Sequence, residues 1–165
     1  MDGEKAGTCL LKEQEPDYES YMQVIFLAEQ HPTDLSAQIA AAYACDRAGD
    51  EHQALRFYEI AWALGIPSAL RFEFLIGLSS TLRNVGRAQE SLDWLQKLSK
   101  EHPDNAALAA FMALTLHDLG HIELALATML EAALKAGNGK GLAPYTRALT
   151  EYRDELSAAG LSPTV

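Results

Sequence analysis

Histidines and cysteines are the residues of this chain that could carry metal-binding or nucleophilic chemistry. His117 and His121 have the i, i+4 spacing with which two imidazoles on one helix face ligate a metal ion. Gly120 lies between them, and glycine commonly ends a helix, so we expect the two rings to lie on different elements. Cys45 follows small apolar residues on the predicted buried side of a helix, where a free thiol packs as a small hydrophobic group. The sequence therefore predicts no metal site and no cysteine nucleophile.

A glycine-rich string at residues 137–141, Gly-Asn-Gly-Lys-Gly, has some likeness to a phosphate-binding loop. It lacks the order Gly-x-x-x-x-Gly-Lys-Ser/Thr, and no strand is predicted before it. We interpret it as a flexible connector that lets a last helix fold back, with Pro144 in the first turn of that helix. No enzymatic activity and no cofactor are predicted.

The net charge of −10, from 23 acidic and 13 basic residues, repels phosphates and anionic lipid headgroups. Nucleic acid and membranes are therefore not expected as partners. The first residues do not combine a basic segment with an apolar one, and no apolar run approaches 18 residues. Cys9 and Cys45 form no disulfide framework. A cytoplasmic protein is the expectation.

The elements that must position these residues are helices, because apolar residues recur at spacings of three and four and helix-forming residues dominate. Three similar segments align on Gly49, Gly86 and Gly120. In each copy a small residue before the glycine and another after it are 12 positions apart: 42 and 54, 79 and 91, 113 and 125. This pattern predicts antiparallel helix pairs that meet closely at the small residues, with the glycine ending the first helix. Pro67 and Pro103 follow the second helix of the first two copies.

This pattern resembles the tetratricopeptide repeat (TPR) family, whose period is 34 residues. The glycines are 37 and 34 residues apart, and Gln38, Leu75 and Ala109 stand where the family has a tryptophan. Residues 77–87 and 110–121 also resemble segments of small, single-domain bacterial TPR proteins, a resemblance that implies no catalytic activity.

The resemblance implies an all-α fold: a TPR-type right-handed α-solenoid of antiparallel helix pairs with a C-terminal capping helix, about eight helices in all. We expect a flexible acidic N-terminal tail at 1–16, a single TPR domain at 17–159 and a C-terminal tail at 160–165. The domain divides into a half repeat at 17–33, repeats at 35–67, 70–104 and 105–137, and a capping helix at 142–158. That helix is expected to cover the last open face of the stack.

Stacked TPR hairpins curve so that their first helices line a concave groove. Counting from the buried positions predicts an apolar and aromatic strip flanked by a few hydrogen-bonding side chains, a surface that suits a peptide or an amphipathic helix. The predicted groove residues are Ile39, Tyr43, Arg47, Ile76, Ser80, Arg83, Asn84, Phe111, Leu114 and His117. TPR domains that bind the C-terminal carboxylate of chaperones carry Lys, Asn and Arg at positions where this chain has Ile39, Tyr43, Gly77, Ala107 and Phe111, so that ligand is not expected.

Two questions stay open at this stage. Arg83 and Asn84 either contact a ligand or serve the fold, with Arg83 paired to Asp46 or Asp118 and Asn84 bonded to the last carbonyls of its helix. The function predicted is a non-catalytic protein–protein interaction module or scaffold. The alternative is a self-associating TPR scaffold, a homodimer whose groove or terminal helix is occupied by the chain itself.

Overall fold

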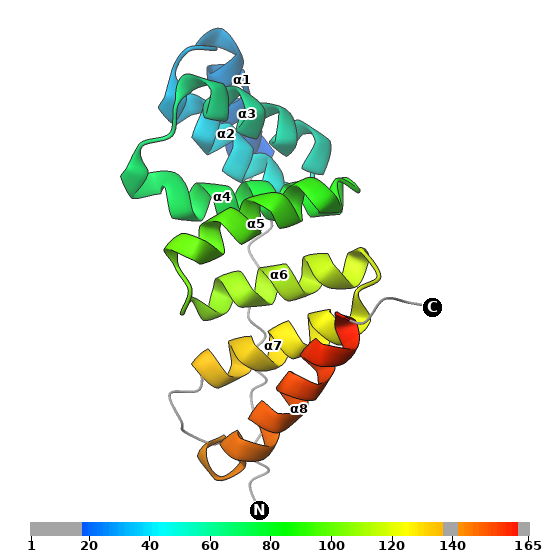
Figure 1. The fold of residues 1–165 in the computed structure, drawn as a ribbon. Coiled ribbons are helices and arrows are strands. Elements are labelled where there is room, and N and C mark those ends of the chain that lie inside the picture. Colours follow the sequence, from blue (N-terminus) through cyan, green and yellow to red (C-terminus); the bar gives the residue numbers. More distant parts are fainter. Residues whose placement is uncertain (1–17, 137–141, 162–165) are drawn as a thin grey trace, which may run out of the picture.

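The computed structural model describes residues 18–136 and 142–161, which form a stack of α-helices without a strand (Figure 1). The eight α-helices of this described part are α1 (Tyr18–Gln30), α2 (Leu35–Ala48), α3 (Glu51–Leu64), α4 (Ser68–Asn84), α5 (Ala88–Glu101), α6 (Ala106–Asp118), α7 (Ile122–Ala136) and α8 (Thr146–Gly160). A short 3₁₀ helix, η1 (Ala143–Tyr145), precedes α8. The prediction of an all-α helical repeat is confirmed. The predicted tail at 1–16, the connector at 137–141, residues 162–165 and Cys9 lie outside the described residues.

The helices form antiparallel pairs, α2 with α3, α4 with α5 and α6 with α7. Helix α1 packs on α2 at the N-terminal end of the stack. The glycine inside each pair adopts the left-handed conformation that the sequence predicts, with φ of 74° at Gly49, 84° at Gly86 and 83° at Gly120. Side-chain caps start two of the first helices: Asp34 accepts from the backbone N–H groups of Ser36 and Ala37, and Asn105 from that of Leu108. The hairpin lengths are thus fixed by caps and glycines.

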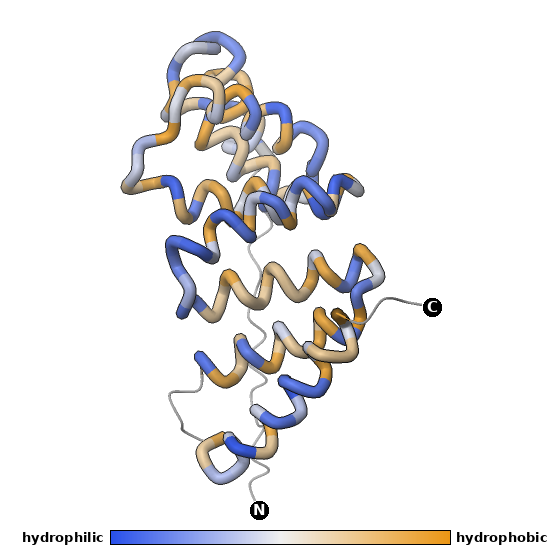
Figure 2. The backbone as a smooth tube through the Cα atoms, viewed as in Figure 1, coloured by the Kyte–Doolittle hydropathy of each residue, from blue (hydrophilic) through white to orange (hydrophobic). Residues whose placement is uncertain are grey.

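The small residues that are 12 positions apart all lie buried between the two helices of their pair. They are Ala42 and Ala54, Ser79 and Ser91, and Ala113 and Ala125. Figure 2 shows hydrophobic positions recurring along every helix of the stack. A large buried cluster runs from α1 to α6, and a smaller one of Leu92, Leu116 and Ala125 joins α5, α6 and α7.

An aromatic row runs through the larger cluster and joins the first pair to the second. The ring of Tyr58 meets that of Phe74 edge to face at 5.2 Å between centroids, and Trp62 lies 6.3 Å from Phe74 and 4.8 Å from Trp94. The hydroxyl of Tyr58 lies against Gly77 of α4, at a place where a Cβ atom would overlap it. Gly77 therefore lets α4 approach α3 closely.

The C-terminal helix is present, but its start and its position differ from the expectation. Pro144 lies in η1, and α8 begins only at Thr146, because the first residues after the connector form a 3₁₀ turn. Helix α4 contacts both α2 and α3, and α6 contacts both α4 and α5, whereas α8 contacts α7 but not α6. In that contact Gly160 of α8 lies against Leu124, and Arg153 pairs with Glu131 at 2.5 Å. Helix α8 thus covers one side of α7 and leaves open the side that an additional repeat would occupy.

Candidate binding surface

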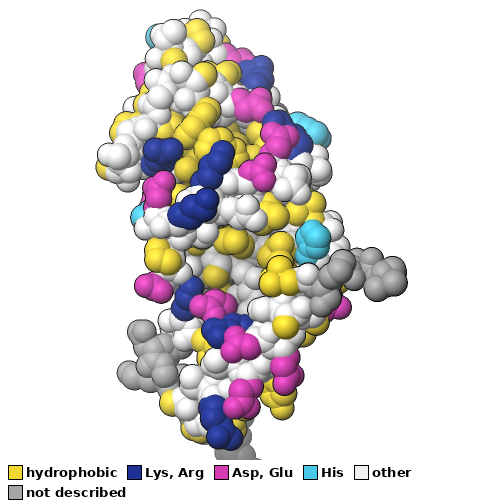
Figure 3. All heavy atoms as spheres, viewed as in Figure 1, with side chains coloured by type: hydrophobic (Ala, Val, Ile, Leu, Met, Phe, Trp, Pro, Cys, Tyr) yellow, Lys and Arg dark blue, Asp and Glu magenta, His cyan; other side chains and the backbone are white. Residues whose placement is uncertain are grey.

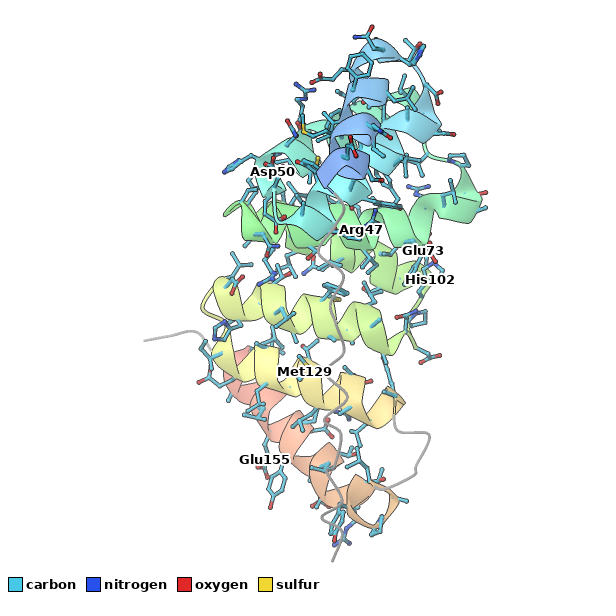
Figure 4. All side chains as sticks on the ribbon, turned by 180° about the vertical axis from the view of Figure 1, so that it is seen from behind. Arg47, Asp50, Glu73, His102, Met129 and Glu155 are labelled. Carbon is cyan, nitrogen blue, oxygen red and sulfur yellow. The ribbon has the colours of Figure 1, made fainter. Side chains whose placement is uncertain are left out.

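The predicted groove residues lie on the first helix of each pair, α2, α4 and α6. Figure 4 views the molecule from behind and labels Arg47 of α2 and Glu73 of α4, which belong to two successive first helices. Four of the predicted residues are half-buried and pack against the large core cluster: Ile39, Tyr43, Ile76 and Phe111. Ser80 is also half-buried, while Arg47 is exposed. The predicted strip is therefore the outer edge of the core.

Tyr43 is the polar group within this strip. Its ring lies 5.9 Å from that of Tyr58, centroid to centroid. Burial raises the pKa of the Tyr43 hydroxyl, and the negative charges of Glu73 and Asp46 raise it further. The hydroxyl therefore stays neutral at physiological pH and can donate or accept a hydrogen bond.

Arg83 and Asn84 belong to a polar chain that crosses three helices. Asn84 Nδ2 donates to Glu51 Oε1 at 2.7 Å, Arg83 Nη2 donates to Asn84 Oδ1 at 2.9 Å, and Arg83 Nη1 donates to Asp118 Oδ2 at 2.9 Å. His117 Nδ1 lies 3.4 Å from the other oxygen of Asp118. Of the two carboxylates considered for Arg83, the structure thus selects Asp118.

Of the partners considered for Asn84, the structure does not show the last carbonyls of its helix, because Asn84 Nδ2 donates to Glu51 instead. The backbone N–H groups of Val85, Gly86 and Arg87 already bond to carbonyls of the last turn of α4. This turn leaves the Asn84 side chain free to reach α3, where it meets Glu51. The polar chain ties the ends of α3, α4 and α6 together.

Asp118, which belongs to this chain, and Asp46, which lies near Glu51, have pKa values shifted in opposite directions. Burial acts to raise the pKa of Asp118, but hydrogen bonds and positive charge from Arg83 and His117 outweigh it and hold that pKa below its ordinary value. Asp46 accepts from the Tyr58 and Thr81 hydroxyls, each at 3.4 Å. Burial and the nearby charge of Glu51 raise the pKa of Asp46 nevertheless.

Leu114 and His117 line an open apolar pocket of about 280 Å³ between α6 and α7. The other lining residues are Ala113, Ile122, Ala125, Leu126 and Met129. Figure 4 labels Met129 on the near side of α7, with α8 behind that helix. Sequence reasoning missed the α7 residues of this pocket, although the repeat alignment places Met129 in register with Tyr58 and Leu95, which are buried.

A second pocket, of about 210 Å³, lies between α3, α4 and α5 around Trp62 and Trp94. Lys97 lies over the ring of Trp94, 4.5 Å from its centroid, and Arg71 lies 5.8 Å from that of Trp62. Arg87 bridges Glu59 and Glu90 at 2.8 and 2.7 Å. Figure 3 shows hydrophobic side chains among charged ones on the face opposite to that of Figure 4. The faces of these two rings are thus already in cation–π contact with Arg71 and Lys97 of the chain itself.

The residues considered for chemistry are placed as follows. Cys45 is buried with a free thiol, and burial raises the pKa of that thiol, which lowers its reactivity. Helix α6 ends at Asp118, between His117 and His121. Within residues 18–136 and 142–161, no group of three or more His, Cys, Asp or Glu side chains is arranged to hold a metal ion. In the same ranges, no helix has both the length and the apolar content needed to span a bilayer.

Comparison with known families gives one finding. The family model described as "Tetratrico peptide repeat" matches residues 36–156, which is more than half of the chain. No curated protein and no solved structure gives a significant match. The matched range begins in α2 and ends in α8, so it includes all three helix pairs.

Proposed function

We propose that this chain, which belongs to the tetratricopeptide repeat family, binds a peptide or a helix of a partner protein along its first helices α2, α4 and α6. Repeat proteins of this family are generally interaction modules without catalysis. We therefore propose a non-catalytic scaffold. A reducing cytoplasm is its proposed setting, which suits the buried free thiol of Cys45.

The observation that carries this proposal is the row of half-buried apolar side chains on three successive first helices. Ile39 and Tyr43 come from α2, Ile76 from α4 and Phe111 from α6. Apolar side chains that a fold leaves partly open at the surface of neighbouring elements are a common feature of interaction sites. The neutral hydroxyl of Tyr43 and the exposed guanidinium of Arg47 supply hydrogen-bonding groups beside it. Arg83 and Asn84 are proposed to shape this surface through their bonds to Asp118 and Glu51.

The test is selection of peptides from a displayed random library on the immobilised protein, followed by affinity measurements with variants. We expect Tyr43→Ala and Ile76→Ala to weaken a selected peptide about tenfold, because each removes apolar contact surface. Tyr152→Ala, which truncates an exposed tyrosine on α8, is the matched control and should bind as the wild type does. Selection of no peptide, or of peptides that bind all variants equally, would contradict the proposal.

The homodimer alternative is tested by light scattering across a dilution series. We expect a monomer at every concentration. A dimer that dissociates on dilution and is lost in Tyr43→Ala would assign the same surface to self-association.

A further inference from the structure

The second helix of each pair presents one face to the repeat that follows, and this face is open on α7 alone among α3, α5 and α7. Leu126 is 51% exposed, whereas Leu55 and Leu92, in register with it, are 8% and 6% exposed. Met129 is 38% exposed, whereas Tyr58 and Leu95 in register with it are 0% and 1% exposed. The same face of α7 begins with Ile122, which is half exposed. This helix therefore keeps apolar residues where its two counterparts are covered.

The two internal repeats show what covers such a face. On α3 it is α4, through the contacts of Tyr58 with Phe74 and Gly77. On α5 it is α6: Ser91 and Thr115 hydroxyls lie 3.3 Å apart, and Leu92 shares a buried cluster with Leu116. Each cover is one helix that contacts both helices of the preceding pair.

Helix α8 does not supply this cover. It packs on a different face of α7, the face that carries Leu124 and Glu131. Ala127 on that face is buried, whereas Arg56 and Asp93 in register with it are exposed. The described part of the chain thus places its last helix beside the position of an additional repeat, not in it.

The size of the open face favours a single helix over a second copy of the chain. Its four exposed aliphatic side chains, Leu114, Ile122, Leu126 and Met129, offer on the order of 300 Å² of apolar surface. A stable dimer buries about 800 Å² on each partner. One docked helix, of the size that covers α3 and α5, matches the smaller area.

The polar chain at the helix ends indicates which charged group a helix docked on the α6–α7 face would carry. Arg83 near the end of α4 pairs with Asp118 near the end of α6, the next first helix. His117 is in register with Arg83 one repeat further along, and its side chain is 68% exposed at the rim of the open pocket. A carboxylate on a docked helix, in register with Asp118, would meet His117 as Asp118 meets Arg83.

We propose that the α6–α7 face is a docking site for an amphipathic helix of a partner protein, with apolar residues at spacings of three and four and a carboxylate near its C-terminal end. This site goes beyond the proposed groove, because its α7 residues lie on a second helix of a pair. The docked helix would continue the stack by one element.

The probe is a stapled, fluorescent synthetic helix with the sequence of residues 105–119, which includes α6, and the readout is fluorescence polarisation with the full chain. We expect saturable binding that Leu126→Gln weakens at least about tenfold, since a polar amide replaces a buried leucine contact. Leu70→Gln makes the same change at an exposed leucine of α4 and should bind as the wild type does. A probe carrying Asp118→Asn should bind about threefold more weakly, because it lacks the carboxylate for His117.

Each other outcome overturns the proposal. Absence of probe binding shows that the face does not accept a helix. The same conclusion follows if Leu126→Gln and Met129→Gln both bind the probe as tightly as the wild type does. A concentration-dependent dimer that Leu126→Gln abolishes assigns the face to a second copy. Much tighter probe binding by a chain truncated after Leu161 assigns it to residues 162–165. Tyr43→Ala should leave probe binding unchanged, so failure here is distinguishable from failure of the groove proposal. Thermal melting of each variant verifies its fold.

Discussion

Arg83 of α4 donates to Asp118 of α6 across 2.9 Å, and the two residues are 35 positions apart in the sequence. The pair joins the ends of successive first helices, and its continuation through Asn84 to Glu51 reaches α3. Because both side chains are partly shielded from water, this pair contributes more than a fully exposed one. It fixes the relative position of two repeats.

Replacing Arg83 by alanine should destabilise the protein by about 1 kcal/mol, since it removes a charge-assisted hydrogen bond. Denaturant unfolding measures this change. Arg147→Ala removes an ion pair of α8 in which the arginine side chain is 92% exposed, and it should have almost no effect. Equal losses in both variants would show that Arg83 contributes nothing particular to the stack.

Because of the Arg83–Asp118 pair, we expect the stability of the protein to fall with pH in the acid range. The pKa of Asp118 lies below its ordinary value in the folded chain, so the stability that this carboxylate contributes is present above the ordinary value and is lost as pH falls through the folded value. We expect the wild type to lose stability more steeply than Arg83→Ala in that acid range. NMR titration of the Asp118 carboxyl should show its pKa rising in the variant. An unchanged pKa would contradict this account.

The Asp46 carboxyl should change the stability of the fold in the opposite direction as pH rises. The folded pKa of Asp46 lies above its ordinary value, so the charged carboxylate costs stability as pH rises from the ordinary value through the folded value. Asp46→Asn can keep bonds to the Tyr58 and Thr81 hydroxyls and removes the repulsion from Glu51. We expect the melting temperature at pH 7 to rise by about 2 °C. The gain should vanish in acid, below the ordinary pKa of an aspartate, where wild-type Asp46 is protonated. Glu155→Gln on α8 removes an exposed charge as the control (Figure 4).

Gly77→Ala should destabilise the protein although alanine is the better helix former. The added Cβ would overlap the hydroxyl of Tyr58, which is fully buried and held against Phe74. Overpacking of this kind costs about 1–3 kcal/mol. In the Tyr58→Phe background the cost should be smaller, because the hydroxyl is gone, and a double-mutant cycle measures the difference. Ser80→Ala, nearby in α4, is the control. A stabilised Gly77→Ala protein would refute the close contact.

Leucines in register on α5 and α7 should differ in their contribution to stability. Leu92→Ala should cost about 2–4 kcal/mol, because Leu92 is buried against α6. Leu126→Ala should cost less than about 1 kcal/mol, because half of that side chain is already in water. Chemical denaturation of the two variants compares them directly. Similar losses would mean that α7 is covered on this face.

The sequence predicts the helix pairs well because their determinants are local. Only a residue tolerant of positive φ suits the positions of Gly49, Gly86 and Gly120, and only small side chains suit pairs such as Ala42 and Ala54. These requirements recur at fixed offsets, so they are visible without an atomic structure. Gly65, with φ of 95° in the longer first connection, has no counterpart in the other copies and was not predicted.

The placement of α8 was not predictable in the same way. Helix α7 carries apolar residues on two faces, one with Leu124 and Ala127 and the other with Leu126 and Met129. Either face could attract a last helix, and the repeat register favours the face with Leu126 and Met129, which α8 does not cover. The partner of Asn84 was also missed, since Glu51 lies 33 residues away and reaches it only through the stagger between α3 and α4.

The division of the core into two clusters has a consequence for cooperativity. The larger cluster joins α1 to α6, whereas Leu92, Leu116 and Ala125 form a separate and smaller one at α7. In a nearest-neighbour array, a terminal unit held by fewer buried contacts opens at a lower free energy than the centre. Amide hydrogens of α7 and α8 should therefore exchange through openings that leave α2 to α5 folded. The end of the stack that could receive a partner helix is the end that can rearrange without unfolding the rest.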